Sequence, residues 1–279
     1  MVTAQKDEVF REWTESARFW EKHGASIRAM FSPVTAALLE EAGITTGQQV
    51  LDVAGGAGEP SLTIAESVGP SGSVMYTDLV AGMLKAAAAE ARRRGITNID
   101  FRQCAADSLP FAENSFDAVV SRLGAMFFPD PLAALREMRR VAKRGGKVSA
   151  VVWYKSEFNP YSYEVTQVVS RRFPGYSSSS IHDAFRFAEP GKLAGVFKEA
   201  GASEIRERLL KFDIAAPISL HEFWEMRSEI SGALRDKLSA ASPETRRKVR
   251  EEILAAVTEY FPNNQMKFPA QMLIVTGSA

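Results

Sequence analysis

The pattern of apolar and polar positions changes near residue 45 of the chain. Residues 3–23 place apolar side chains among charges at helical spacing. A second helix is expected from about Ser32 to Ala42, with Ser32 as its N-cap and Pro33 at its first position. After these two helices, short apolar runs alternate with helical stretches. The chain therefore predicts a helical N-terminal segment followed by an α/β region.

Five short apolar runs predict the strands of that region. They are 49–54, 73–77, 99–104, 117–121 and 147–153. The helices expected between them cover 60–67, 81–94 and 131–143, and glycines follow the last two. Strands that alternate with helices at this spacing form βαβ units, which build a parallel sheet with helices on both faces.

The chain after residue 153 is less regular. Residues 154–188 are rich in aromatic side chains, contain four consecutive serines and are expected to be irregular. A helix at 190–200, a strand at 203–212, two charged helices within 219–260 and a last strand at 271–276 follow. We therefore divide the chain into a helical cap (1–44), a core (45–153) and a part that completes the sheet (154–279), with inserted lid helices (213–268).

Composition and charge narrow the possible partners. The chain carries 34 Lys and Arg against 34 Asp and Glu. Since proteins that bind a polyphosphate backbone usually carry a basic excess, we expect no nucleic-acid partner. The single cysteine, Cys104, allows neither an intramolecular disulfide nor a cysteine-rich metal site, and no metal is predicted.

The chain also lacks the signals of export or membrane insertion. Its N-terminus is charged where a signal peptide needs an apolar run, and no uncharged apolar stretch approaches the roughly 20 residues that cross a bilayer. We therefore expect a cytoplasmic protein without a membrane span. Either a monomer or a homodimer fits these properties.

A glycine-rich loop follows the first strand of the core, over Asp52–Gly58. Glycines between a strand and a helix let the backbone approach a ligand, and the N–H groups at the start of the helix can receive a carboxylate or phosphate. The dinucleotide pattern G-x-G-x-x-G is incomplete, because Ser61 stands at its third glycine position. The Gly-Lys-Ser/Thr of a P-loop is also missing.

Acidic residues stand at the ends of three successive strands. Asp78, at the end of the second, can accept both hydroxyls of a ribose, and it can also cap the helix that follows. Asp107, which follows the third strand, can accept a hydrogen bond from an adenine amino group. Taken alone, an aspartate at this position would be explained by helix capping or by solvation. With Asp52 at the first strand, the series favours a ligand that contains adenosine.

Five motifs in unbroken order resemble those of class I S-adenosylmethionine-dependent methyltransferases. Within that class, they resemble the branch that includes the ubiquinone/menaquinone-biosynthesis C-methyltransferases (UbiE-like, methyltransferase type 11). The motifs lie at 50–60, 78–84, 106–111, 116–122 and 129–147. The resemblance implies a Rossmann-like fold: a seven-stranded, mostly parallel sheet with helices on both faces and a helical lid. It also implies that 270–277 form an antiparallel strand beside the fifth.

The resemblance assigns roles to individual residues. The glycine loop would cradle the amino-acid end of S-adenosylmethionine, the acids after the second and third strands would hold ribose and adenine, and Arg122 and Leu123 would lie beneath the methionine portion. The implied cofactor site comprises Asp52, Ala54, Gly55, Gly56, Gly58, Asp78, Leu79, Met83, Ala106, Asp107, Ser108, Arg122 and Leu123.

Two positions depart from the family's pattern. Ala54 replaces the usual first glycine of the loop, a small change that we expect the loop to tolerate. Met126 and Phe127 stand where many members have histidines, which suggests an apolar wall instead of a base. The residues expected to line the acceptor pocket are Trp20, Phe31, Met126, Phe127 and Trp153. His23 and His182 are the candidates for a general base, which methyl transfer needs only when the nucleophile must lose a proton.

The sequence thus predicts an S-adenosylmethionine-dependent methyltransferase with a small, apolar or aromatic acceptor and S-adenosylhomocysteine as product. The alternatives are an NAD(P)-dependent oxidoreductase and a non-catalytic protein that binds the cofactor. The neutral charge disfavours RNA as acceptor, and the aromatic lid disfavours a bulky protein. Segments 1–35, 154–188 and 213–268 are predicted to cover the cofactor as a lid. The acceptor and the methylated atom stay open.

Overall fold

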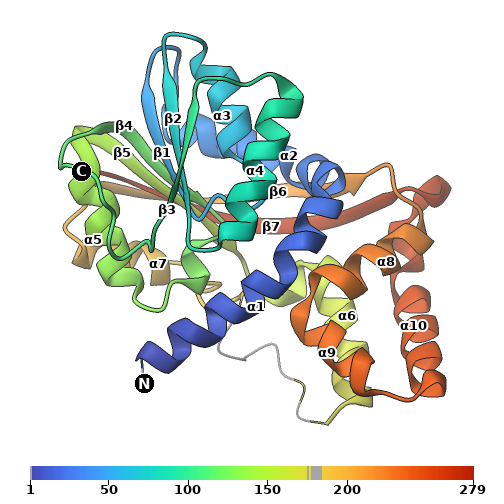
Figure 1. The fold of residues 1–279 in the computed structure, drawn as a ribbon. Coiled ribbons are helices and arrows are strands. Elements are labelled where there is room, and N and C mark those ends of the chain that lie inside the picture. The colour runs from blue at the N-terminus through green and yellow to red at the C-terminus, as the bar shows by residue number, and fades with distance from the viewer. Residues whose placement is uncertain (1, 175, 177–183) are drawn as a thin grey trace.

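A seven-stranded sheet organises the molecule, seen in Figure 1. The computed structural model describes residues 2–174, 176 and 184–279, the first eight of them by their backbone alone. The strand order is β3-β2-β1-β4-β5-β7-β6. The strands are β1 (Gln49–Val53), β2 (Ser73–Asp78), β3 (Ile99–Gln103), β4 (Phe116–Arg122), β5 (Ala142–Trp153), β6 (Ser203–Ala216) and β7 (Met266–Ser278).

Among the described strands, only the last, β7, runs antiparallel to both of its neighbours. β1 to β5 pair in parallel, whereas β7 pairs antiparallel with both β5 and β6. The β5–β7 register runs from Lys147 opposite Ser278 to Trp153 opposite Met272. The prediction of an antiparallel strand at 270–277 beside the fifth strand is therefore confirmed, and so is the Rossmann-like, mostly parallel fold.

Helices cover both faces of the sheet, as the alternating pattern predicts (Figure 1). α2 (Gly24–Glu41), α3 (Ser61–Val68) and α4 (Ala81–Arg94) lie on one side, and α5 (Pro131–Val141) and α7 (Lys192–Glu199) lie on the other. Gly95 ends α4 in a left-handed conformation, with φ of 69°, as expected for a glycine after a helix. The strand and helix succession of the core follows the sequence pattern closely.

The prediction that the second helix starts at Ser32 was wrong. α1 spans Val2–Lys22 and α2 starts at Gly24, so Pro33 lies inside a helix. A proline in a helix leaves the carbonyl four residues earlier without its usual donor. Here the hydroxyl of Ser32 donates to that carbonyl, on Ala29, at 3.1 Å. The Ser-Pro pair therefore continues the helix where the sequence pattern indicates a start.

The segment 154–188, predicted to be irregular, contains the helix α6 (Pro160–Arg172). Its buried face comprises Tyr161, Val165, Val168 and Val169, which follow helical spacing. The helices within 219–260 number three instead of two: α8 (Leu220–Ile230), α9 (Gly232–Ala240) and α10 (Pro243–Val257). A serine at each N-cap accepts a backbone N–H and separates them: Ser219, Ser231 and Ser242.

α6, α8, α9 and α10 form a group beside the extended ends of β6 and β7 (Figure 1). Residues 213–216 and 266–268 belong to those strands and not to lid helices. The ring of Phe268 on β7 packs against Tyr161 and Phe223 at centroid distances of 5.6 and 5.5 Å. α1 runs between this group and the core and contacts α4 and α8. None of the described helices combines the length and the apolar composition that a membrane span requires.

Candidate functional site

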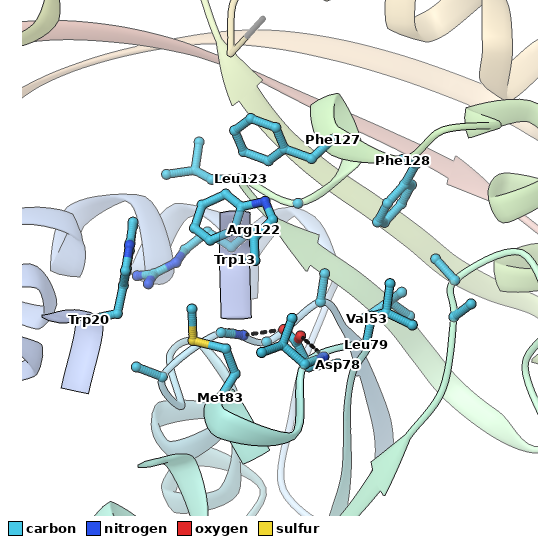
Figure 2. A pocket seen from close by; sticks show the side chains of 18 of the residues that line it. Trp13, Trp20, Val53, Asp78, Leu79, Met83, Arg122, Leu123, Phe127 and Phe128 are labelled. Atoms are coloured by element: carbon cyan, nitrogen blue, oxygen red, sulfur yellow. Dashed lines mark hydrogen bonds between the residues drawn. The ribbon is translucent and has the colours of Figure 1, made fainter. Parts of the chain in front are cut away.

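A cavity opens at the carboxyl edge of the sheet, where ligands of doubly wound folds bind. Its walls come from the ends of β1, β2 and β4, the segment after β3, and the helices α1 and α2, as Figure 2 shows in part. Segments far apart in the sequence thus meet around one space. Most of the lining residues are apolar, and the charged ones include Asp78 and Arg122 at the ends of two strands.

The loop after β1 adopts conformations that favour glycine. Ala54 has φ of 61° and Gly56 has φ of 56°, both in the left-handed region. Added to Gly55, a Cβ atom would lie 2.5 Å from the ring of Tyr76. Added to Gly58, at φ of 118°, it would lie 2.9 Å from Leu62. The loop is therefore packed against the sheet and α3, while Gly56 faces open space and lines the cavity.

Asp78 links this loop to the start of α4. Its Oδ2 accepts from the backbone N–H of Gly56 at 3.0 Å, and its Oδ1 accepts from that of Val80 at 2.9 Å (Figure 2). Burial raises the pKa of Asp78, while these backbone N–H groups lower it. Since an ionised carboxylate offers about four acceptor sites, each oxygen keeps room for a further donor from the cavity. The capping role and the ligand role are thus compatible.

Asp52 lies beneath the loop and does not line the cavity. It is fully buried, and its Oδ2 accepts from the hydroxyl of Ser61 at 2.6 Å. Burial raises the pKa of Asp52 to about 7, while Ser61 and Arg122 act in the opposite direction. Ser61, at the position of the third dinucleotide glycine, therefore serves as the hydrogen-bond partner of Asp52. This arrangement fits the ordering role expected for Asp52.

Arg122 extends from the end of β4 beneath the cavity. Its Nη1 donates to Thr35 Oγ1 at 2.8 Å and its Nη2 donates to the backbone oxygen of Glu59 at 3.0 Å. The guanidinium lies 5.8 Å from the centroid of the Phe31 ring. Burial lowers the pKa of Arg122, and the carboxylates of Glu59 and Asp52 raise it. The next residue, Leu123, also lines the cavity.

The wall beside Asp78 is apolar and partly open. Of the residues expected to hold the cofactor here, Leu79, Met83, Ala106 and Asp107 line the cavity, whereas Ser108 does not. Cys104, which the sequence analysis did not assign to the site, lines it as well. Burial raises the pKa of its thiol to about 11, so that Cys104 is a neutral thiol near pH 7. Its position at a strand end, just before the third motif, was the signal that could have identified it.

Aromatic rings form the opposite wall. The ring of Trp13 on α1 lies 5.6 Å from that of Trp20 and 5.2 Å from that of Phe127, with edge-to-face geometry. Phe127 belongs to the short 3₁₀ helix η1 (Ala125–Phe127). The contact of Trp13 with Phe127 therefore joins α1 to the end of β4 over the cavity. Of the residues expected in an acceptor pocket, Trp20, Phe31 and Phe127 line the cavity, and so do three that the sequence analysis did not name: Phe10, Trp13 and Phe128.

Two predicted pocket residues lie outside the cavity lining. Met126 is buried in the core, because the 3₁₀ helix turns its side chain away from its neighbour Phe127. Trp153 is buried behind Phe31, with ring centroids 6.0 Å apart, and also packs against Phe185. Trp153 thus supports one wall without forming it.

Of the two histidine candidates, the structure describes only His23. His23 does not line the cavity, and its Nε2 lies 2.6 Å from a carboxylate oxygen of Glu229 on α8. The pair fixes the junction of α1 and α2 to the helical group. His182 lies outside the described residues. Among the described residues, no histidine lines the cavity and no cluster of acids, cysteines and histidines could hold a metal.

The cover of the cavity is smaller than the predicted lid. Within segment 1–35, residues of α1 and α2 line it, but no described residue of 154–188 or 213–268 does. Those segments instead form α6 and α8–α10, and α8 and α9 contact α1 from outside. Among the described residues, only the first of the three predicted lid segments therefore lines the cavity, and α8 and α9 of the third contact that segment from outside.

The strand order and the carboxyl-edge cavity define the class I methyltransferase fold. Residues 35–218 match the ubiE/COQ5 methyltransferase family, and the chain belongs to that family. The ubiquinone/menaquinone biosynthesis C-methyltransferase UbiE of Stenotrophomonas maltophilia is 36% identical over 144 residues, 49% of this chain and 57% of that protein. UbiE of Xanthomonas oryzae is 32% identical over 184 residues, 62% of this chain and 73% of that protein. The chain thus spans little more than half the length of the first relative.

Solved structures agree on the fold. The YcgJ protein of Bacillus subtilis has a TM-score of 0.56 at 21% identity, covering 88% of this chain and 98% of that one. Phosphoethanolamine N-methyltransferase 2 of Haemonchus contortus, in complex with S-adenosylhomocysteine, has a TM-score of 0.57 at 18% identity, covering 96% of this chain and 59% of that one. At these identities, the likeness concerns the fold alone.

Proposed function

We propose that this protein is an S-adenosylmethionine-dependent methyltransferase that acts on a small apolar or aromatic acceptor. One observation carries the proposal: a single cavity joins the glycine loop, the Asp78 carboxylate and a wall of aromatic rings. Membership of the ubiE/COQ5 methyltransferase family supports the reaction type. The aromatic wall supports the acceptor class.

The polar edge of the cavity fits the cofactor. Asp78 has free acceptor capacity for two ribose hydroxyls, and Leu79 and Met83 offer apolar surface for adenine. Asp107 and Ala106 line the same cavity and would contact the edge of the adenine ring. The loop from Ala54 to Gly58 would hold the amino-acid end, with Gly56 leaving space for close approach.

Methyl transfer asks mainly for positioning. S-adenosylmethionine supplies an activated methyl group on a sulfonium. The protein's contribution is to hold donor and acceptor in line and to exclude water, which can account for several kcal/mol of the barrier. Trp13, Trp20 and Phe127 provide an apolar enclosure for this purpose.

The acceptor side includes a buried polar group with no partner in the described part of the chain. The indole N–H of Trp20 is buried without a hydrogen-bond partner among the described residues. Because an unmade bond is costly for a buried donor, an acceptor that carries an oxygen suits this wall. The curated relatives are C-methyltransferases of quinone biosynthesis by name, which supports an oxygenated ring. We propose that the acceptor is such a ring compound, methylated on a carbon, oxygen or nitrogen atom.

The oxidoreductase alternative has a structural argument against it. The third glycine of a dinucleotide loop allows the helix to pack close to the strand. Here Ser61 occupies that position and is committed to Asp52. A non-catalytic cofactor-binding protein would share the cofactor edge, and only activity distinguishes it.

Two measurements test the proposal. In isothermal titration calorimetry, we expect the protein to bind S-adenosylhomocysteine and not NADH; the reverse would support the oxidoreductase. A screen with methyl-labelled S-adenosylmethionine against quinols, phenols and amines should then give label transfer to a ring compound. Cofactor binding without transfer to any acceptor class would support the non-catalytic alternative.

A further inference from the structure

The aromatic side of the cavity lies largely outside the part of the chain that matches the family. The match covers residues 35–218, which include the glycine loop and Asp78 at the cofactor edge. Four aromatic residues that line the cavity precede this range: Phe10, Trp13, Trp20 and Phe31. Three of them lie on α1, so the position of α1 has to be explained by contacts of this chain's own.

α1 lies between the cavity and the helical group, with a different face toward each. On the inner face, Trp13 and Trp20 line the cavity. Ala17, between them on the same face, packs against Val80 and Met83 at the start of α4. The outer face of α1 is left for α8 and α9, which contact this helix. What holds the outer face therefore decides where the inner rings stand.

Glu229, near the end of α8, holds the last turn of α1. Lys22 Nζ lies 2.7 Å from both carboxylate oxygens, and His23 Nε2 lies 2.6 Å from one of them. Burial raises the pKa of Glu229, but the hydrogen bonds from Lys22 and His23 outweigh it and place the pKa below its usual value. The side chain of Glu229 is 29% exposed, so salt screens this contact less than a pair on the open surface.

Arg235 on α9 fixes the end of α8 that carries Glu229. Its Nη1 donates to the backbone oxygen of Glu229 at 2.8 Å, and its guanidinium lies 5.2 Å from the ring centroid of Phe19 on α1. Phe19 and Lys22 are one turn apart on the outer face of α1. The last turns of α1 are therefore held from outside by both helices.

We propose that Glu229 is a positioning residue for the acceptor, which anchors α1 and so holds the rings of Trp13 and Trp20 in the wall beside Phe127. This inference rests on the proposed function and deepens it. α1 ends before residue 35 and α8 begins after residue 218, so both sides of the contact lie outside the family match. Acceptor recognition thereby depends on two segments outside that match, whereas the cofactor edge lies within it.

The test reverses the charge of Glu229. In Glu229→Lys two ammonium groups face each other, and hydrogen exchange over residues 10–22 should become at least about 10-fold faster, the scale of a lost hydrogen bond to a charged group. With hydroquinone as acceptor probe in the label-transfer assay, KM should rise at least about 10-fold and kcat change less than about 3-fold, because fewer molecules have the wall in place. The Kd of S-adenosylhomocysteine should rise less than about 3-fold, since Asp78 and the glycine loop are held by the sheet.

Two further variants separate positioning from a general loss of structure. The double variant Lys22→Glu, Glu229→Lys restores opposite charges and should recover most of the exchange protection and of the KM. Glu252→Lys is the matched control, because Glu252 of α10 pairs with Arg172 of α6, two other helices of the same group. It should leave the exchange of α1 and the KM unchanged.

Unchanged exchange of α1 in Glu229→Lys would overturn the proposal. The same effects in Glu252→Lys, or equal losses for hydroquinone and S-adenosylhomocysteine, would overturn it as well. If Glu229→Lys does not fold, Glu229→Gln removes the charge alone and should show the same pattern at about 3-fold. If the unaltered protein binds S-adenosylhomocysteine but transfers no label to any ring compound, the proposed function is refuted, and the exchange of α1 still decides whether Glu229 anchors the helix.

Discussion

Replacing Asp78 by alanine should weaken cofactor binding more than any other single change at the polar edge. The carboxylate accepts two backbone N–H groups and has capacity left for both ribose hydroxyls. Hydrogen bonds to a charged group contribute about 1.5–3 kcal/mol, so that Asp78→Ala should raise the dissociation constant for S-adenosylhomocysteine by roughly 10- to 150-fold. Calorimetry measures this directly.

Adenosine and 5′-methylthioadenosine should lose affinity to the same extent, because both keep the ribose. Asp117→Ala is the matched control: its carboxylate also accepts a backbone N–H, from Gln49 at 2.8 Å, but it lies outside the cavity lining. That variant should bind the ligand normally. Unchanged affinity in Asp78→Ala, with circular dichroism showing an intact fold, would refute the assignment of the ribose to Asp78.

Three further predictions concern the loop, its acid and the cover. Burial raises the pKa of Asp52 from 3.8 to about 7. Between these two pH values the folded state therefore binds more protons than the unfolded state. The contribution of Asp52 to the free energy of unfolding falls as the pH rises from about 4 to about 7. Urea unfolding should therefore show Asp52→Asn gaining stability relative to the unaltered protein over that range; a constant difference would contradict the shift. Gly55→Ala should lower the free energy of unfolding by about 1–3 kcal/mol, because the added Cβ would meet the ring of Tyr76. The control Gly195→Ala lies in α7, where a Cβ finds open space and ordinary helix geometry, so it should be neutral or stabilising. Hydrogen exchange in α1 should slow on addition of S-adenosylhomocysteine, and protection confined to the strand ends would count against α1 as a cover.

The regular part of the fold could be predicted because local signals agreed with the tertiary structure. In the core, each apolar run and each stop glycine, such as Gly95, coincides with an element boundary. The start of α2 was missed because a Ser-Pro pair usually begins a helix, and only the structure shows the hydroxyl of Ser32 replacing the lost donor. The sequence analysis expected too few helices within 219–260 because it relied on the charge pattern of the whole segment. The boundary between α8 and α9 depends instead on one local signal, the N-cap at Ser231.

The cofactor edge was more predictable than the acceptor wall. Strand-end acids and glycines occupy fixed places in a parallel sheet, so the sequence placed Asp78 and Gly56 in the cavity. The aromatic wall depends on how α1 crosses the sheet, which no local pattern specifies. For that reason Trp13 was missed, and Trp153 was assigned to a wall that it only supports. Adjacent residues such as Met126 and Phe127 diverge because a 3₁₀ helix turns one inward and the other to the cavity.

The most direct test of the account is transfer of the methyl label from S-adenosylmethionine to an oxygenated ring compound by the purified protein. The account predicts transfer that S-adenosylhomocysteine inhibits, with the rate at subsaturating cofactor falling by at least about 10-fold in Asp78→Ala, in step with its lost affinity. No transfer to any compound of the screen, despite tight binding of S-adenosylhomocysteine, would contradict the assignment as an enzyme.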